Sequence, residues 1–172
     1  MSAAVPIVRG EGDGERRWFA GGGVWTMKAT SEETDGAFML IEDRMQKGKT
    51  TPLHVHPHED ETFIVLEGEI LVHVDGSEHR VGPGSIAVVP RATRHAFLVI
   101  SEMARILALQ TPGSGEAFYR DASEPSTDET DTERPADFGR LRAAAERNPS
   151  CIQILGPPPF AAVKELAARA QT

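Results

Sequence analysis

Short apolar stretches separated by turn residues occupy the first two thirds of the chain. Val, Ile, Phe and Leu dominate these stretches, and Gly, Pro or Asp stands between them. Apolar stretches of this length, several of them alternating with polar positions, are typical of β-strands. The pattern predicts strands over 24–30, 37–45, 62–66, 69–75, 85–89, 95–100 and 105–109. Many short strands at close spacing favour an all-β sandwich or barrel, in which Asp75-Gly76 forms a tight hairpin turn.

The texture of the sequence changes at both ends of this region. Residues 1–15 are rich in Gly and charged residues and are expected to form an N-terminal arm before a barrel at 16–111. Residues 121–137 hold seven acidic residues and one Arg. Such a stretch has little apolar surface to bury, so an acidic flexible linker is expected over 112–134. A C-terminal helical tail is expected over 135–172.

Two helices are predicted within the tail. The first runs from Pro135 to Arg147 and ends at Asn148-Pro149. The second follows the run of three prolines at 157–159. Apolar residues at helical spacing give each helix one face that needs a partner: Phe138, Leu141 and Ala145 in the first, and Phe160, Val163, Leu166 and Ala170 in the second.

Composition and charge exclude several classes of function. The chain of 172 residues carries a formal net charge of −8, which disfavours binding to nucleic acid and to anionic membranes. A single cysteine, Cys151, allows neither an internal disulfide nor a thiolate metal cluster, and it is assigned no function. Apolar runs are too short to cross a bilayer, and no signal peptide is recognised at the N-terminus. We therefore expect a soluble cytoplasmic domain.

A cluster of histidines and carboxylates is the most informative feature. His54 and His56 are two residues apart, so an extended backbone directs both side chains to one face of a strand. Pro57 allows a turn after them, Glu61 leads into the next strand, and His95 begins a later one. Imidazoles and a carboxylate in this arrangement are suited to a divalent metal. The remaining polar residues are interpreted as structural: a solvated turn at His58, Glu59 and Asp60, and a hairpin end at His73 and His79.

These residues resemble the two motifs of the cupin family. The first motif is matched at every spacing by Gly48, His54, His56, Glu61 and Gly68. The second is matched in spacing by Gly84, Pro90, Ala92, His95 and Val99, with Ala in place of a glycine and Val in place of an asparagine. The resemblance covers about residues 35–110. The tail is similar to those of small bacterial cupins called quercetin-dioxygenase-like.

The resemblance implies a fold, a metal site and a pocket. The fold is a double-stranded β-helix, or jelly-roll barrel, with a short C-terminal helical tail and the metal inside. The metal ligands carried over by the motifs are His54, His56, Glu61 and His95. The cofactor is one divalent transition metal, with iron, nickel, manganese, cobalt and zinc left open. Strand alternation adds an apolar substrate pocket of Phe63, Val65, Phe97 and Val99.

Three functions are compatible with this site. The first is a metal-dependent dioxygenase, similar to quercetinases, that acts on a small aromatic or enolic substrate, with Glu61 as both ligand and catalytic base. The second is a redox-neutral isomerase, lyase or polyketide cyclase, and the third is a non-catalytic module that binds a small molecule. His58 and Tyr119 are weaker candidates for a second acid or base. Exposed edge strands also favour a homodimer.

Overall fold

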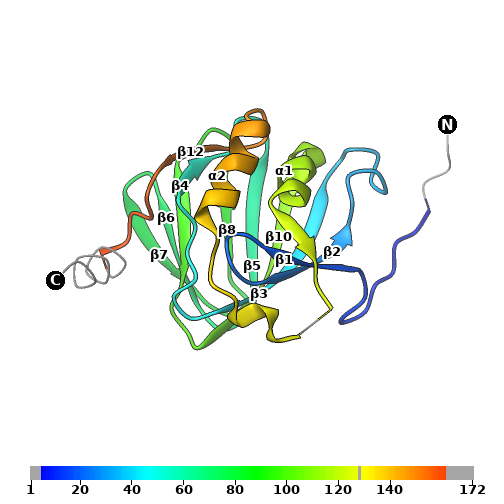
Figure 1. The fold of residues 1–172 in the computed structure, drawn as a ribbon, viewed down its shortest axis with the longest axis horizontal. Coiled ribbons are helices and arrows are strands. Elements are labelled where there is room, and N and C mark those ends of the chain that lie inside the picture. The colour runs from blue at the N-terminus through cyan, green and yellow to red at the C-terminus, as the bar shows by residue number, and fades with distance from the viewer. Residues whose placement is uncertain (1–4, 128, 162–172) are drawn as a thin grey trace.

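Two antiparallel β-sheets face each other in the computed structural model, which describes residues 5–127 and 129–161 (Figure 1). The first sheet has seven strands in the order β11-β1-β2-β3-β10-β5-β8. The second has five strands in the order β12-β4-β9-β6-β7. The fold is therefore a jelly-roll barrel, the double-stranded β-helix that the sequence predicts.

The strands of the first sheet are β1 (Glu15–Phe19), β2 (Val24–Ala29), β3 (Met39–Gln46), β5 (Asp60–Glu67), β8 (Ile86–Val89), β10 (Met103–Thr111) and β11 (Ser123–Pro125). Those of the second sheet are β4 (Leu53–Val55), β6 (Ile70–Val74), β7 (Ser77–Val81), β9 (His95–Val99) and β12 (Gln153–Gly156). The described helices are α1 (Glu116–Asp121) and α2 (Phe138–Arg147), with 3-10 turns at Gly113–Gly115 and Glu129–Glu133.

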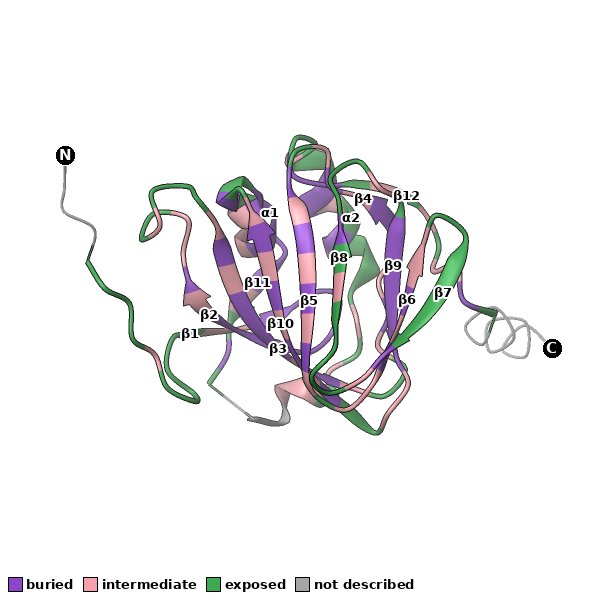
Figure 2. Cartoon of the chain, turned by 180° about the vertical axis from the view of Figure 1, so that it is seen from behind, coloured by how far each residue is buried: buried purple, intermediate pink, exposed green. Residues whose placement is uncertain are grey.

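Alternation of side chains places the core between the sheets. Strand β10 buries every second residue from Ala104 to Gln110 and pairs with β3 on one side and β5 on the other. The same alternation of buried and partly buried positions is visible along the neighbouring strand β5 (Figure 2). The predicted hairpin is confirmed: Asp75 and Gly76 both adopt positive φ, at 44° and 89°, and join β6 to β7.

Residues 112–134 differ from the expected flexible linker. They form α1 and β11, and β11 pairs with β1 at the edge of the first sheet. The acidic composition concealed two features. Phe118 and Tyr119 are buried against Phe19, and several carboxylates in and around the segment are paired with arginines. These ion pairs join Glu116 to Arg120, Asp121 to Arg147, and Glu124 to both Arg134 and Arg140.

The chain ends agree with the sequence in part. Residues 5–14 precede the first strand and are largely exposed, as expected of an arm. The first predicted tail helix is α2, which begins after Asp137, whose side chain accepts a hydrogen bond from the backbone N–H of Arg140. Strand β12 follows and was not predicted. The second predicted helix lies outside the described residues, apart from its start at Phe160, which is buried.

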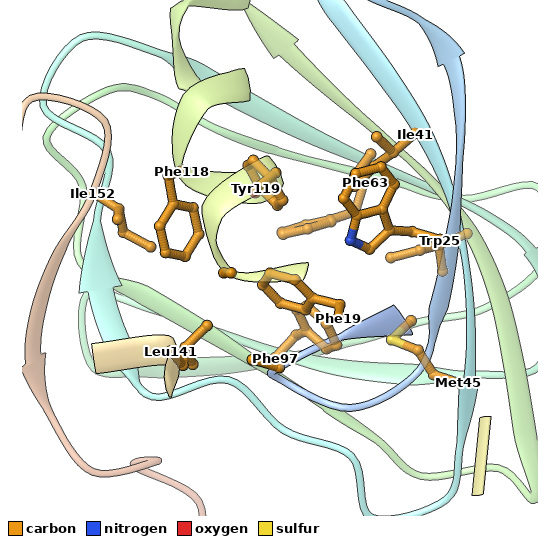
Figure 3. Close-up of a cluster of buried hydrophobic side chains, with 14 of the residues drawn as sticks. Phe19, Trp25, Ile41, Met45, Phe63, Phe97, Phe118, Tyr119, Leu141 and Ile152 are labelled. Carbon is orange, nitrogen blue, oxygen red and sulfur yellow. The ribbon is translucent and has the colours of Figure 1, made fainter. Parts of the chain in front are cut away.

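Helix α1 is attached to the barrel mainly by aromatic packing (Figure 3). Phe118 is 1% exposed and meets Phe19 edge to face, with ring centroids 6.2 Å apart. We expect Phe118→Ala to lower the free energy of unfolding by about 3–5 kcal/mol, because it leaves a cavity beneath α1. Urea denaturation measures this change.

A matched control lies on α2. Phe138 is 47% exposed, so Phe138→Ala should change the free energy of unfolding by less than about 0.5 kcal/mol. Equal effects of the two substitutions would show that α1 is not packed on the barrel as described.

Candidate metal centre

Four buried side chains converge inside the barrel. One ligand atom from each of His54, His56, Glu61 and His95 lies within 4.8 Å of the others. His54 comes from β4, His56 follows that strand, Glu61 lies on β5 and His95 begins β9. His54 and His95 are cross-strand partners, and their ring centroids are 4.2 Å apart. The four residues predicted from the sequence as metal ligands are therefore brought together.

Backbone carbonyl groups fix the orientation of all three imidazoles. Nδ1 of His54 lies 2.8 Å from Pro52 O, and Nδ1 of His95 lies 2.9 Å from Thr93 O. Nδ1 of His56 lies 2.8 Å from Cys151 O, which belongs to the segment after α2. A carbonyl oxygen can only accept, so each Nδ1 carries the proton and each Nε2 is left for another partner. This arrangement is typical of metal-binding histidines.

Nitrogen and oxygen atoms with lone pairs lie close together at the centre of the cluster. His95 Nε2 lies 2.9 Å from Glu61 Oε2, and His56 Nε2 lies 3.5 Å from the same oxygen. Both nitrogens of His95 thus face oxygen acceptors, an arrangement that requires a cation between Nε2 and the carboxylate, either a proton or a metal ion. Donor atoms around one ion at about 2.1 Å are separated by up to about 4.2 Å. The donor atoms of this cluster lie within 4.8 Å of one another, so only a slight inward movement lets them surround one metal ion.

Two further residues hold the other oxygen of Glu61. Tyr119 of α1 donates its hydroxyl hydrogen to Glu61 Oε1 over 3.2 Å, and it accepts a hydrogen bond of 2.9 Å from Gln110 Nε2. Gln110 Nε2 also lies 3.4 Å from Glu61 Oε1. Tyr119 was predicted as a weaker acid–base candidate, and Gln110 was not singled out. Both contact the carboxylate directly.

Charge interactions in the cluster favour an ionised Glu61. Burial opposes the carboxylate, but His56 and His95 outweigh it and hold the pKa of Glu61 well below its usual range. Burial also opposes a charged His56, but Glu61 outweighs it and raises the pKa of His56. Burial, together with the two other imidazoles, holds the pKa of His54 well below its usual value. Burial and Glu61 raise the pKa of Tyr119, which stays a phenol.

An apolar cavity adjoins the polar cluster. His54, Glu61 and Tyr119 stand on its wall, and about 50 Å³ is open to the centres of water molecules. Aromatic and aliphatic side chains supply most of the remaining wall: Phe19, Trp25, Ile41, Phe63, Phe97, Ile106, Phe118, Leu141, Ile152 and Ile154. Several of these surround the same space in Figure 3. Leu141 of α2 and the segment after it therefore close one side of the cavity.

The predicted pocket residues lie at two depths. Phe63 and Phe97 line the cavity beside the cluster. Val65 and Val99 are buried in the hydrophobic core without forming part of this wall. Val65 and Val99 lie two positions beyond Phe63 and Phe97, on the same face of each strand but about 7 Å further along it. Alternation therefore predicts the face on which a residue lies, but not its depth in the barrel.

One of the turn residues also differs from expectation. His58 is exposed, as predicted for a solvated turn, whereas Glu59 is only 1% exposed. Its Oε1 accepts a hydrogen bond from Ser114 Oγ. The serine lies in the segment expected to be a linker, so the sequence offered no signal for this contact.

Comparison with known proteins agrees with this geometry. Residues 42–109 match the Cupin domain family. A quercetin 2,3-dioxygenase of Bacillus subtilis is 32% identical over 122 residues, which is 71% of this chain. An L-ectoine synthase of Hahella chejuensis is 29% identical over 69 residues, which is 40% of this chain.

Solved structures share the fold. An RmlC-like cupin from Shewanella frigidimarina is 20% identical and superposes with a TM-score of 0.55, covering 63% of this chain and 92% of that one. The family match over residues 42–109 and the 32% identical relative show that the chain belongs to the cupin superfamily. It spans 36% of the length of the quercetin 2,3-dioxygenase and 52% of that of the L-ectoine synthase.

Metal uptake by the cluster should release protons. His56 must lose its proton from Nε2 before it can coordinate, and its pKa is raised, so we expect metal affinity to increase as the pH rises through that pKa. Calorimetric titration with Zn²⁺ in buffers of different ionisation enthalpy counts the protons. About one proton per ion is expected at pH values below that pKa, and the count should fall as the pH rises through it. Uptake that is independent of pH across this range would contradict the described charge state.

Proposed function

We propose that the protein is a metal-dependent dioxygenase for a small aromatic or enolic substrate. The observation that carries this proposal is a buried cluster of three imidazoles and one carboxylate, of which His54 and Glu61 stand on the wall of a largely apolar cavity. Four protein ligands leave coordination positions open on an octahedral metal, as catalytic sites require. The likeness to a quercetin 2,3-dioxygenase over 71% of the chain supports the same class of reaction.

His54, His56, Glu61 and His95 would hold the metal. A redox-active ion supplies the chemistry that brings an electron-rich substrate and dioxygen together. The apolar walls exclude water and accept a flat ring. Glu61 lies on the cavity wall as an ionised carboxylate, in position to take a proton from a substrate hydroxyl.

Tyr119 positions the carboxylate for that transfer. Its hydroxyl group donates to Glu61 Oε1 and so restrains one oxygen, while Oε2 faces the imidazoles. Because Tyr119 remains protonated, it holds Glu61 without competing for the proton. The proposed division of roles therefore gives proton transfer to Glu61 and its orientation to Tyr119.

The size of the cavity limits the substrate. The free volume between the walls is small, about 50 Å³, so a compact ring needs less movement of the walls than a flavonol would. An outer groove of about 760 Å³ lies between α2 and β12 and shares Pro52, Leu141, Ile152 and Ile154 with the cavity wall. These shared side chains mark the route by which a substrate would enter.

A redox-neutral isomerase, lyase or cyclase is the alternative. The hydrogen bond between Tyr119 and Glu61 joins two acid–base groups beside the cavity, which also suits proton transfer within a substrate. The same ligands would then hold zinc as a Lewis acid. A binding module would keep the metal without turnover.

Oxygen consumption separates these functions. The protein would be loaded separately with Fe²⁺, Ni²⁺, Co²⁺, Mn²⁺ or Zn²⁺ and offered small β-diketones, catechols and hydroxypyrones. We expect oxygen uptake in step with substrate loss for at least one redox-active metal and none for zinc. His56→Ala should lose the metal and lower the rate by at least about 100-fold while the fold survives.

Substrate conversion without oxygen uptake would contradict the dioxygenase and support the redox-neutral alternative. Full activity of His56→Ala would show that the site is assigned wrongly. The exposed His58→Ala serves as the matched control and should keep both metal and rate.

Assembly and location stay predictions from the sequence. The edge strand β8 exposes Ile86 and Val88, which supports the proposed homodimer. Among the described residues, no helix has the length and apolar character needed to cross a bilayer.

A further inference from the structure

A second polar group lies on the cavity wall, away from the metal cluster. Asp43 of β3 and Lys49, which follows that strand, both line the cavity, and Lys49 Nζ lies 3.3 Å from Asp43 Oδ2. Their side chains are only 10% and 6% exposed. Removing two charges from water is costly, and a well-packed apolar pair often serves stability as well. The ion pair therefore calls for an explanation beyond stability.

The register of the sheet separates this pair from the metal cluster. Along β10, Gln110 is the partner of Glu61, and Ile106 is the partner of Asp43. Four residues of strand correspond to about 13 Å between the two levels of the barrel. Phe63 and Ile41 flank Ala108 on β10, halfway between the levels, and all three line the cavity. An apolar section thus joins two polar ends.

At the end of the cavity that contains Asp43, several polar groups have unused hydrogen-bonding capacity. The Lys49 ammonium group has three hydrogens, and within the described residues it donates one hydrogen bond, to Asp43 Oδ2. In the part of the chain that the structure describes, Asp43 Oδ1 and Trp25 Nε1 are both buried without a hydrogen-bond partner of good geometry. Trp25 also lines the cavity, and in Figure 3 its indole nitrogen faces the space beside Tyr119 and Phe19. Buried polar groups are rarely left unsatisfied without a role.

The backbone around the pair is shaped to enclose it. Gly23 has a φ of +92°, and a Cβ atom there would lie 2.4 Å from Lys49 Nζ and 3.1 Å from Asp43 Oδ1. Only glycine therefore allows the turn before β2 to pass so close to both charges. Phe19 covers the ammonium with its ring centroid 5.7 Å from Nζ. The pair is thus a built feature of the cavity wall.

We propose that Asp43, Lys49 and Trp25 recognise a neutral hydroxyl group at the end of the substrate opposite its metal-binding group. A hydroxyl can donate to Asp43 Oδ1 while it accepts from Lys49 or Trp25, which satisfies the leftover groups together. A carboxylate would place a second negative charge against Asp43. This inference rests on the proposed function, because the other end of the same molecule coordinates the metal ion.

The charge state of the pair agrees with a neutral ligand. Burial raises the pKa of Asp43 to about 6, with Lys49 acting in the opposite direction. Burial also lowers the pKa of Lys49. The pair is neutral overall whether the proton resides on the lysine or on the carboxylate, so the cavity end carries no net charge to attract an ion.

Two pyrones that differ by one hydroxyl group test the proposal. Kojic acid and allomaltol both chelate metals through adjacent keto and hydroxyl oxygens, and kojic acid alone carries a hydroxyl on the substituent at the opposite side of the ring. The binding of each to the Zn²⁺-loaded protein would be measured by calorimetry, which needs no turnover. We expect the wild type to bind kojic acid about tenfold more tightly than allomaltol.

Two variants remove the recognition groups without leaving a single buried charge. Trp25→Phe deletes the indole N–H, and the double variant Asp43→Asn with Lys49→Met removes both charges. Each should reduce the preference for kojic acid to less than about threefold and keep Zn²⁺ stoichiometry and allomaltol binding. Lys47→Met is the matched control, because Lys47 lies in the same turn, is 58% exposed and pairs only with Glu102 among the described residues. It should keep the full preference.

The outcomes separate this inference from the proposed function. Equal affinity of the wild type for both pyrones, or a preference that survives in both variants, would overturn the recognition site alone. Failure of both pyrones to bind the Zn²⁺-loaded wild type would overturn the recognition site and the proposed substrate class together. Loss of Zn²⁺ from the double variant would show that the pair supports the fold instead, and an undiminished preference in Trp25→Phe would then confirm that conclusion.

Discussion

The rest of the site depends on one constraint, which is that nitrogen and oxygen atoms with lone pairs lie close together in one buried place. Nε2 of His95 and Oε2 of Glu61 lie 2.9 Å apart, while Nδ1 of the same ring donates to a carbonyl oxygen. Buried acceptors at this distance repel each other unless a proton or metal ion lies between them. The barrel holds them in place with backbone hydrogen bonds, which the sheet and its turns make rigid. Binding of a cation removes this repulsion, so the binding free energy also stabilises the folded centre.

The tail of the chain is part of this organisation. Cys151 was assigned no function from the sequence, yet its carbonyl oxygen fixes the ring of His56. Leu141 of α2 and Ile152 close the cavity beside the cluster, and Tyr119 of α1 reaches Glu61 from the same end of the barrel. The segments after β10 therefore complete a site whose ligands all come from the barrel itself.

The sequence predicts the parts of the site that are local. His54, His56 and Glu61 lie within one strand–turn–strand unit, and His95 begins a recognisable strand, so spacing and strand geometry suffice. Tyr119, Gln110 and the carbonyl of Cys151 reach the site through tertiary packing, which spacing cannot reveal. The expected linker illustrates the same limit. Its acidic composition predicts solvation, but arginines elsewhere in the chain neutralise the carboxylates and two aromatic rings are buried beneath them.

The cavity combines two chemical environments along one axis. The metal cluster and the Asp43–Lys49 pair lie about four residues apart on the register of β10, with aromatic and aliphatic walls between them. A flat molecule with an oxygen at each end satisfies both environments and fills the space between them. Binding of such a molecule would give a role to the charges that the barrel keeps buried at two levels of its interior.

The proposed chemistry requires one metal ion in the cluster. Anomalous X-ray diffraction from crystals of the protein, purified without chelators or added metal, would locate that ion. We expect a single transition-metal peak within coordination distance of Nε2 of His54, His56 and His95 and of a carboxylate oxygen of Glu61. No peak there after soaking with Zn²⁺, or a peak held by other residues, would contradict it.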